Sequence, residues 1–413
     1  MPRIPALIIG AGQAGLAMSQ CLTDRGIAHV VLERGRIAER WHSERWDSLR
    51  LLTPNWMSRL PAWTYQGNDP DGFMTAADFA EHLSHYARAS QAPVCTETTV
   101  RCVRPGPHGY VVDTDRGRWE ANAVVIATGN CDEPAVPAMA QRLPETIRQI
   151  APPAYRNPDL LPRGGVLVVG ASATGAQIAD EIQRAGGRQV WLAAGGHTRV
   201  PRTYRGRDIW HWLDAIGILD DRWDAVSDIV RARRQPSFQL VGRPDRQDLT
   251  LGTLHQAGVR MLGRVMDARG SMMRFADDLP ATLDSAHAAL ERLLARIDAC
   301  ADKLGAPADP RGCPRIILPP APTALDLAAE GIGTVVWATG YNRNYRWLRV
   351  PVLDAAGEIA HDGGVTPAPG LYVLGLRFMR RRRSNFIDGV GLDAHDLAEH
   401  LTAHLAAGFR RAA

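Results

Sequence analysis

The sequence predicts an α/β protein that contains two Rossmann-like dinucleotide-binding domains, the second inserted in the first, together with an additional helical segment. Three observations predict this architecture. A GxGxxG motif at residues 10–15 follows an apolar strand and opens a helix, and a similar glycine motif returns at residues 170–175, about 160 residues later. The length of 413 residues also exceeds what one ordinary hydrophobic core accommodates.

The positions of the two motifs indicate how the domains are arranged along the chain. Residues 1–150 are expected to form the first part of one dinucleotide-binding domain, and residues 333–413 to complete it. Residues 151–332 are expected to form the inserted domain, with a helical insertion at residues 205–310. A proline-rich connector from Pro134 to Pro162 is typical of a linker between domains.

Apolar periodicity predicts the individual elements in order. Strands are expected at 7–9, 30–32, 98–103, 109–114, 123–127, 166–169, 189–193, 334–337 and 371–374. Helices are expected near 75–90, 176–184, 283–304 and 391–407, and residues 205–305 are expected to be mostly helical.

The composition is that of a globular chain, with 45% hydrophobic and 22% charged residues, and it excludes a disordered or fibrous protein. The formal net charge is +4, so no polyanionic partner such as nucleic acid is implied. Only one of the 48 basic residues is a lysine, Lys303, so an anion-binding site must rely on arginine. We expect neither nucleic acid nor a membrane as partner, and a homo-oligomer is left open.

The sequence has no recognisable targeting signal. The first strand pattern begins by Ile4, which leaves no room for a signal peptide, and no apolar run reaches transmembrane length. The six cysteines are scattered without paired spacing, as is typical of reduced thiols and not of disulfides or a metal site. We therefore expect a soluble, cytoplasmic protein without a metal centre.

The first glycine motif reads GAGQAG at residues 10–15 and predicts a dinucleotide site. Gly10 permits the tight turn, Gly12 lets a pyrophosphate approach the backbone, and Gly15 lets helix and strand pack closely. The helix N-terminus then presents free N–H groups to the pyrophosphate. Glu33, at the end of the next strand, is the acid expected to hydrogen-bond a ribose hydroxyl. A glycine turn without a ligand is the alternative.

The second motif reads GASATG at residues 170–175, with Ser172 in place of the middle glycine. Serine is small, and its hydroxyl could itself contact a phosphate. The strand that follows ends without an acid, and Arg199 and Arg202 come next. An arginine there fits the extra phosphate of NADPH, whereas an acid would favour NADH. Surface arginines in an arginine-rich chain are the alternative. The candidate NADPH-binding residues are Gly170, Ser172, Ala173, Thr174, Gly175, Arg199 and Arg202.

The order of motifs resembles that of the class B flavin-dependent monooxygenases. GAGQAG is followed by Glu33, Trp41, RWDSLRLLTP at 45–54, ATG at 127–129, the proline-rich linker, the second glycine motif and ATGY at 338–341. This order is similar to that of the flavin-containing, YUCCA-type and Baeyer–Villiger monooxygenases over roughly residues 4–204 and 333–395. The nearest match looks like bacterial flavoproteins of the potassium-transport type, a label that does not bear on mechanism.

The resemblance implies that FAD occupies the first site and NADPH the second. It implies that NADPH reduces the flavin, that a C4a-(hydro)peroxyflavin forms with O₂, and that one oxygen atom passes to a small organic substrate. This chemistry needs no protein nucleophile, so no catalytic residue is assigned. The segment 45–54 would run beside the isoalloxazine ring. The candidate FAD-binding residues are Gly10, Gly12, Gln13, Ala14, Gly15, Glu33, Arg34, Trp41, Arg45, Leu52, Thr128, Gly129 and Gly375.

Three departures from the family pattern support other hypotheses. Ala151 stands where the linker signature has a histidine, although Tyr155 and Arg156 of that signature remain. Leu52 stands where flavin-containing monooxygenases have an asparagine, and Leu376 replaces an aspartate. The altered linker signature and Leu376 favour, as a second hypothesis, an FAD-dependent oxidase or dehydrogenase that inserts no oxygen. A non-catalytic flavin-binding redox sensor is a third, against which the two glycine motifs count.

Two further stretches are rich in arginine. The run Arg380–Arg383 is interpreted either as a pocket for a cofactor phosphate or an acidic substrate, or as a solvated loop between strand and helix. The second stretch is expected to help form or cover the substrate cavity. It contains Trp210, Trp212, Trp223, Arg231, Arg233 and Arg234.

Overall fold

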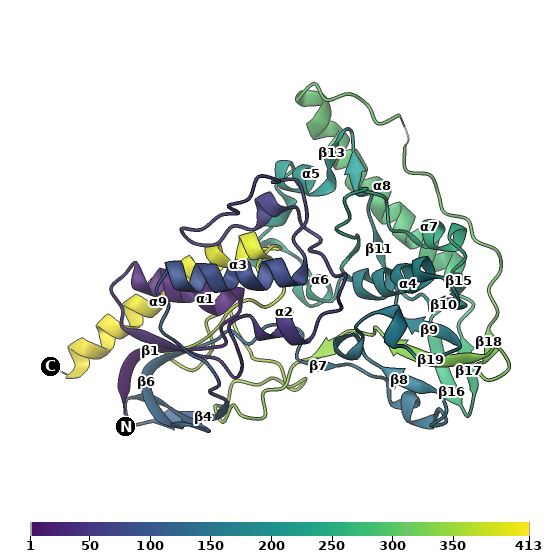
Figure 1. Ribbon diagram of the computed structural model, residues 1–413. Helices are drawn as coiled ribbons and strands as arrows, with labels where there is room; N and C mark the ends of the chain where they lie inside the picture. Colours follow the sequence, from purple (N-terminus) through teal and green to yellow (C-terminus); the bar gives the residue numbers. More distant parts are fainter. Residues whose placement is uncertain (1, 311, 413) are drawn as a thin grey trace.

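The computed structural model describes residues 2–310 and 312–412, which form two lobes lying side by side (Figure 1). The sheet of the first lobe consists of β1 (Arg3–Ile9), β2 (His29–Leu32), β3 (Val94–Cys95), β4 (Val100–Gly106), β5 (Gly109–Thr114), β6 (Gly117–Ile126) and β21 (Leu371–Val373). Its order is β3-β2-β1-β6-β5-β4, and β21 pairs with the second half of β6. Parallel pairing joins β3, β2, β1, β6 and β21, whereas β4, β5 and the first half of β6 form an antiparallel meander.

The sheet of the second lobe is parallel throughout. It consists of β8 (Arg148–Ile150), β9 (Gly165–Val169), β10 (Val190–Ala193), β15 (Arg260–Leu262) and β19 (Ile332–Trp337), in the order β15-β10-β9-β19-β8. A small antiparallel sheet of β16 (Val265–Arg269), β17 (Met272–Phe275) and β18 (Ala324–Asp326) lies beside it. Two short pairs complete the lobe: β11 (Thr198–Arg199) with β14 (Phe238–Gln239), and β12 (Thr203–Tyr204) with β13 (Arg207–Asp208).

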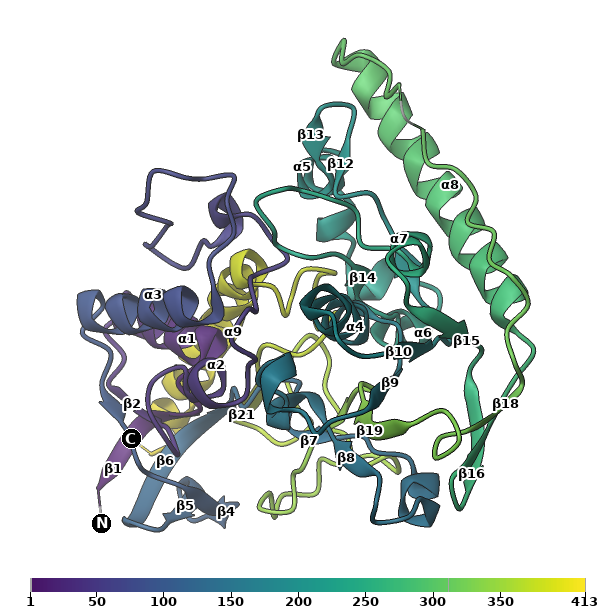
Figure 2. The same ribbon diagram turned by 45° about the vertical axis from the view of Figure 1, so that its right-hand side comes forward.

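The helices cover the two sheets and build an outer layer on the second lobe. The helices of the first lobe are α1 (Gln13–Thr23), α2 (Glu39–Ser43), α3 (Ala76–Ala89) and α9 (Ile387–Ala412). Those of the second lobe are α4 (Ala173–Ala185), α5 (Ile209–Ala215), α6 (Ile229–Arg233), α7 (Leu251–Gln256) and α8 (Leu279–Lys303). Figure 2 shows α8 running along the outer side of the second lobe. In the described part of the chain, no helix combines the length and the apolar character needed to cross a membrane.

The central strands are apolar because both of their faces are covered. β9 is buried at every position, and so are the last four residues of β1, which is the pattern expected of parallel strands packed between layers. On the first lobe, α1 packs against α9, and α3 begins with a capping box in which Thr75 and Asp78 exchange hydrogen bonds. The result is one apolar core around the first sheet and two around the second.

The two lobes are joined by two crossings of the chain that are hydrogen-bonded to each other. The first crossing contains β7 (Glu133–Pro134) and the second contains β20 (Tyr341–Asn342), which pair antiparallel. The N–H of Ala135 also donates to the carbonyl oxygen of Gly340 at 2.9 Å. Both crossings therefore form one narrow ribbon between the lobes (Figure 1).

Both expected domain boundaries need correction. β8 lies before residue 151, and β19 begins at Ile332 and extends to Trp337, yet both strands belong to the sheet of the second lobe. The Pro134–Pro162 connector is therefore more than a linker, because it supplies an edge strand. The insertion expected at 205–310 is also mixed: it contains α5 to α8, but β15 inside it is part of the central sheet. Short strands between helices give too little periodicity to be recognised from sequence.

Gly15→Ala is expected to prevent stable folding. A methyl group at Gly15 would lie 1.8 Å from the carbonyl oxygen of Gly10, so helix α1 and the preceding turn would have to separate. Overpacking of this kind costs roughly 3 kcal/mol or more when backbone must move. The measurement is soluble yield and urea unfolding followed by circular dichroism. Gly12→Ala is the matched control, because a methyl group there meets nothing within 4 Å. Equal stability of the two variants would contradict this account.

Candidate cofactor site

A cavity of about 600 Å³ lies at the carboxyl edge of the first parallel sheet. Its walls come from the loops that follow β1, β2, β6 and β21, because the carboxyl ends of parallel strands meet at one edge of a sheet. A second, more open hollow of about 680 Å³ lies between residues 65–78 and Arg246, and it includes neither glycine turn. The smaller, glycine-lined cavity is therefore the candidate cofactor site.

The first glycine turn shapes this cavity. Gly10 has a φ of +105°, and a Cβ there would lie 2.6 Å from the carbonyl oxygen of Ala127. A Cβ on Gly12 would meet nothing within 4 Å, so this residue faces open space at the start of α1. No side chain caps the helix there. Open space in front of uncapped helix N–H groups fits the pyrophosphate of a dinucleotide.

Glu33 is fixed at the end of β2 beside this turn. Its Oε2 accepts a hydrogen bond from the N–H of Ala11 at 2.8 Å, and its Oε1 accepts one from Gly35 at 3.0 Å. The residue is only 9% exposed, yet it lines the cavity. A carboxylate oxygen has more than one acceptor site, so Glu33 can still accept from a ribose hydroxyl. This geometry also fits a dinucleotide.

Most of the predicted FAD-binding residues line this cavity. Arg45 lies over the ring of Trp41 at 5.0 Å. Gly15 lies beneath the turn against Gly10, and Leu52 is not part of the cavity wall. The predicted residues that line it are Gly10, Gly12, Gln13, Ala14, Glu33, Arg34, Trp41, Arg45, Thr128, Gly129 and Gly375. Their contact with FAD itself stays a prediction.

Leu52 is instead connected to the second lobe. Its carbonyl oxygen accepts hydrogen bonds from Nη1 of Arg202 and from Nε1 of Trp210, both at 2.8 Å. The nearby Asn55 is engaged within its own loop, where it donates to the Asp69 carbonyl and accepts from the Met74 N–H. Leu52 has no side-chain amide and that of Asn55 is engaged in its own loop, so neither residue offers an amide group to the cavity.

The second glycine turn repeats the geometry of the first. Gly170 has a φ of +108°, and a Cβ on Gly175 would lie 1.8 Å from the carbonyl oxygen of Gly170. The hydroxyl of Ser172 donates to the carbonyl oxygen of Ser237 at 3.3 Å and does not cap α4. The first N–H groups of α4, which include those of Ala173 and Thr174, thus have no side-chain cap. This turn can also receive a pyrophosphate.

The placement of Arg199 and Arg202 contradicts the prediction that they bind the extra phosphate of NADPH. Arg199 is 7% exposed and donates from both Nη atoms to the carbonyl oxygen of Pro314 at 3.1 Å. Arg202 is fully buried and pairs with Asp208 at 2.6 Å. Burial lowers the pKa of both guanidinium groups. Both arginines are enclosed by protein and hold the second lobe together.

A different arginine lies near the end of β10, where the extra phosphate is expected. The side chain of Arg264 lies within 4 Å of the position that a Cβ on Gly195 would take, and it is 60% exposed. Its Nε is paired with Asp278 at 3.4 Å, which leaves both Nη groups for a phosphate. A hollow of about 230 Å³ opens next to it at Gly196 and His197. His197 donates from Nδ1 to the Gly195 carbonyl oxygen at 3.1 Å, and burial lowers its pKa. Its buried Nε2 has no partner among the described residues. The sequence could not indicate Arg264, because β15 brings it back from 70 residues further on.

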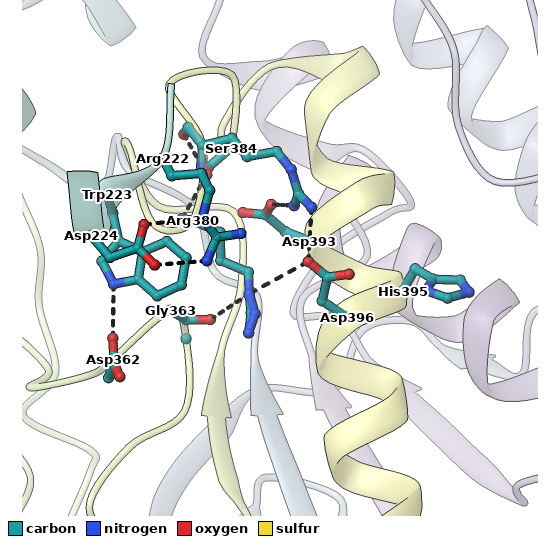
Figure 3. A network of polar contacts seen from close by, with 12 residues as sticks. Arg222, Trp223, Asp224, Asp362, Gly363, Arg380, Ser384, Asp393, His395 and Asp396 are labelled. Atoms are coloured by element: carbon teal, nitrogen blue, oxygen red, sulfur yellow. Dashed lines mark hydrogen bonds and ion pairs between the residues drawn. The ribbon is translucent and has the colours of Figure 1, made fainter. Parts of the chain in front are cut away.

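The run Arg380–Arg383 is neither a free anion pocket nor a solvated loop. Figure 3 shows Arg380 stacked beside Trp223 and directed towards Asp396, with Asp393 close by. The backbone of the run also pairs with residues 219–223, so it fastens the helical segment to the first lobe. The ion pairs are Arg380–Asp396, Arg381–Asp393, Arg381–Asp396, Arg382–Asp221, Arg383–Asp214, Arg383–Asp220 and Arg383–Asp388.

The tryptophans expected to form or cover the substrate cavity do not line the candidate cofactor cavity, and their role at a substrate stays a prediction. Trp210 and Trp212 are 3% and 1% exposed, and they pack in an apolar core beneath α8 with Leu290 and Leu294. Trp223 donates from Nε1 to Asp362 at 2.8 Å (Figure 3). None of the three lines the 600 Å³ cavity.

Several cavity residues were missed by the sequence interpretation. Asn130 donates from Nδ2 to the Gly375 carbonyl at 3.0 Å and accepts from the Arg377 N–H at 3.3 Å. Asn130 directly follows the ATG turn at residues 127–129, so its position in the sequence could have marked it as a cavity residue. Arg377, Trp347 and Asn385 also line the cavity, and no local pattern marks them.

Comparisons with known proteins agree with this architecture. Residues 7–206 match the pyridine nucleotide-disulphide oxidoreductase family. A CzcO-like oxidoreductase of Geobacillus kaustophilus is 30% identical over 97% of this chain and 99% of its own length. Indole-3-pyruvate monooxygenase YUCCA4 of Oryza sativa subsp. japonica is 31% identical over 43% of this chain and 44% of its own.

Solved structures share the fold over nearly the whole chain. A flavin-containing monooxygenase from Stenotrophomonas maltophilia superposes with a TM-score of 0.68 at 18% identity, covering 98% of this chain and 99% of that one. A bacillithiol disulfide reductase from Staphylococcus aureus superposes with a TM-score of 0.61 at 13% identity, with 98% and 99% covered. The two-lobed architecture with paired glycine turns and the similarity across the entire length lead to one assignment: this chain belongs to the CzcO-like oxidoreductases.

Proposed function

We propose that the protein is an FAD-dependent, NADPH-using monooxygenase that inserts one oxygen atom from O₂ into a small organic substrate. One observation carries the proposal: the second glycine turn is linked by hydrogen bonds to a residue that lines the cavity at the first turn. Ser172 of the second turn bonds the Ser237 carbonyl, and the Ser237 hydroxyl accepts from Arg377, which lines the cavity of the first turn. Two dinucleotides bound at these turns would meet at the junction of the lobes.

The residues present fit FAD in the first lobe. Gly12 and the N-terminus of α1 would receive the pyrophosphate, and Glu33 would accept from the ribose hydroxyls. Trp41, stacked under Arg45, forms an apolar and aromatic wall of the same cavity. When bound, FAD supplies the redox chemistry, accepting a hydride from NADPH and activating O₂.

The chain itself contributes positioning. The segment at Leu52 is fixed by two donors from the second lobe, Arg202 and Trp210. Tyr155 and Arg156 of the linker act from the other side: Arg156 donates to the carbonyl oxygens of Ser43 and Arg45, and Tyr155 donates to Glu181 of α4. The segment 43–52 is thus held between both lobes, as a precise site for oxygen transfer requires.

An oxidase or dehydrogenase remains the second candidate, and specific residues favour it. Neither Ala151 nor Leu52 can donate a side-chain hydrogen bond to a cofactor, and Leu376 is a buried apolar residue. With fewer polar contacts around the flavin, O₂ activated there would more readily be released as hydrogen peroxide.

The ratio of hydrogen peroxide released to NADPH consumed distinguishes the two candidates. For a monooxygenase, the ratio should fall well below one when an accepted substrate is added, because oxygen then enters the product. Peroxide and NADPH are measured in the same reaction, with ¹⁸O₂ used to label the product. A ratio that stays at one with every substrate class would favour the oxidase.

Arg264→Ala is expected to raise KM for NADPH roughly tenfold and to leave KM for NADH nearly unchanged. The reason is the loss of a charge-assisted hydrogen bond to the extra phosphate, which is typically ~1.5–3 kcal/mol. Steady-state kinetics with both coenzymes provide the measurement. Arg260→Ala is a suitable control, because Arg260 stacks on Trp191 and lies beside Glu330. A parallel rise of both KM values would show that Arg264 does not read the phosphate.

A further inference from the structure

The junction of the lobes contains two arginines without a carboxylate partner. Arg377 donates from Nη1 to the Gln235 carbonyl at 3.2 Å and from Nη2 to the Ser237 hydroxyl at 3.0 Å. Arg233 donates from Nε to the Phe378 carbonyl at 3.3 Å. Within the described part of the chain, no carboxylate lies within 4 Å of either guanidinium group. This distinguishes them from the four arginines at 380–383, whose charges are compensated by aspartates.

The two arginines lie on segments that cross each other. Arg233 ends α6 and reaches the backbone after β21, while Arg377 follows β21 and reaches the backbone after α6. Asn130 lies against the same crossing, since it accepts from the Arg377 N–H and lies 3.4 Å from Nη1 of Arg343. The crossing therefore brings three guanidinium groups near one another, and one of them, that of Arg377, lines the cavity.

Acidic side chains near the crossing are already engaged. Glu358 pairs with Arg343, Asp221 pairs with Arg382, and Asp362 accepts from Trp223. Burial, followed by repulsion from Arg233, lowers the pKa of His361 to about 4, so this imidazole adds no charge at neutral pH. The positive charge of Arg233 and Arg377 is left without a local counterion.

An uncompensated guanidinium in a partly enclosed site costs free energy, because arginine cannot lose its proton and is removed from water. Burial, and after it the positive charge of Arg343, lowers the pKa of Arg233. The lowered pKa reflects the same free-energy cost of the enclosed charge. Arg377 has N–H groups left over, since only two of its nitrogens are engaged. An anion bound here would remove the cost and accept those hydrogen bonds.

We propose that Arg377, assisted by Arg233, binds the carboxylate of the substrate, so that the substrates of this protein are organic carboxylates. The inference rests on the proposed function, because it concerns the cavity in which that reaction would occur. Arg377 lines the cavity at the first glycine turn, and its bond to Ser237 leads towards the second turn, so a carboxylate held by Arg377 would lie on the side of the cavity that faces the second lobe. The other possible anions are a phosphate of FAD and a phosphate of NADPH. The experiment distinguishes both of them from a substrate carboxylate.

The test is calorimetric titration of the FAD-loaded protein, without NADPH and without turnover. The probes are acetate, phenylacetate and phenylpyruvate, with phenylacetamide as the neutral counterpart of phenylacetate. At least one carboxylate should bind saturably, and phenylacetamide should bind at least tenfold more weakly than phenylacetate. Arg377→Gln should weaken carboxylate binding about tenfold, Arg377→Lys less, and Arg233→Gln several-fold. FAD content and KM for NADPH should change by less than twofold.

Arg231→Gln is the matched control, because Arg231 is an exposed cation on α6, the same helix as Arg233, and its loss should leave carboxylate binding unchanged. Loss of FAD from Arg377→Gln would assign the arginine to the FAD pyrophosphate. A tenfold rise in KM for NADPH would assign it to that coenzyme. Either result overturns the proposal, as does equal binding of acid and amide or no saturable binding by any carboxylate.

The proposed function can fail separately. Charge-dependent carboxylate binding together with peroxide release equal to NADPH consumption would retain the anion site and remove oxygen transfer. Oxygen transfer to neutral substrates, unaffected by Arg377→Gln, would do the reverse.

Discussion

The architecture depends on one close contact that occurs twice: a helix backbone that touches the turn before it with no side chain between. Gly15 against Gly10 and Gly175 against Gly170 bring α1 and α4 directly onto their strands. This contact aims the first N–H groups of each helix at the edge where the parallel strands end. The cavity, the position of Glu33 and the hydrogen bonds that link one turn to the other all depend on this close contact. A single added methyl group at either contact would move the helix and with it the binding edge.

The sequence predicts this part of the molecule well because its signals are local. Glycine turns, buried parallel strands and the acid at the end of β2 are each set by residues within one βαβ unit. The wrong or incomplete predictions concern contacts between distant segments. Arg199 and Arg202 follow β10 as expected, but the protein encloses them, and Arg264 reaches the same place from another strand. The partners of Arg380–Arg383 include Asp214, Asp220 and Asp221, which no pattern near residue 380 could reveal.

Charge compensation then distinguishes two kinds of arginine in a chain with almost no lysine. The arginines of the 380–383 run neutralise aspartates and fasten the helical segment. Tyr155 and Arg156 of the linker also hold segments together, Tyr155 through Glu181 and Arg156 through the carbonyl oxygen of Arg45. Arg233 and Arg377, which have no carboxylate partner among the described residues, lie at the junction of the lobes, and Arg377 lines the cavity. Arginine thus joins segments of the chain where aspartates lie next to it, and it can bind a ligand where the fold places no carboxylate beside it.

The ribbon of β7 and β20 limits how the lobes can move. Because the two crossings pair through Pro134–Tyr341 and Glu133–Asn342, they cannot lengthen or shift independently. Separation of the lobes along the ribbon would break backbone hydrogen bonds, whereas twisting of the ribbon would keep them. Together with the bonds that hold the Leu52 segment and the Arg380–Arg383 run to the second lobe, this pairing restrains the relative orientation of the two lobes at several separate places.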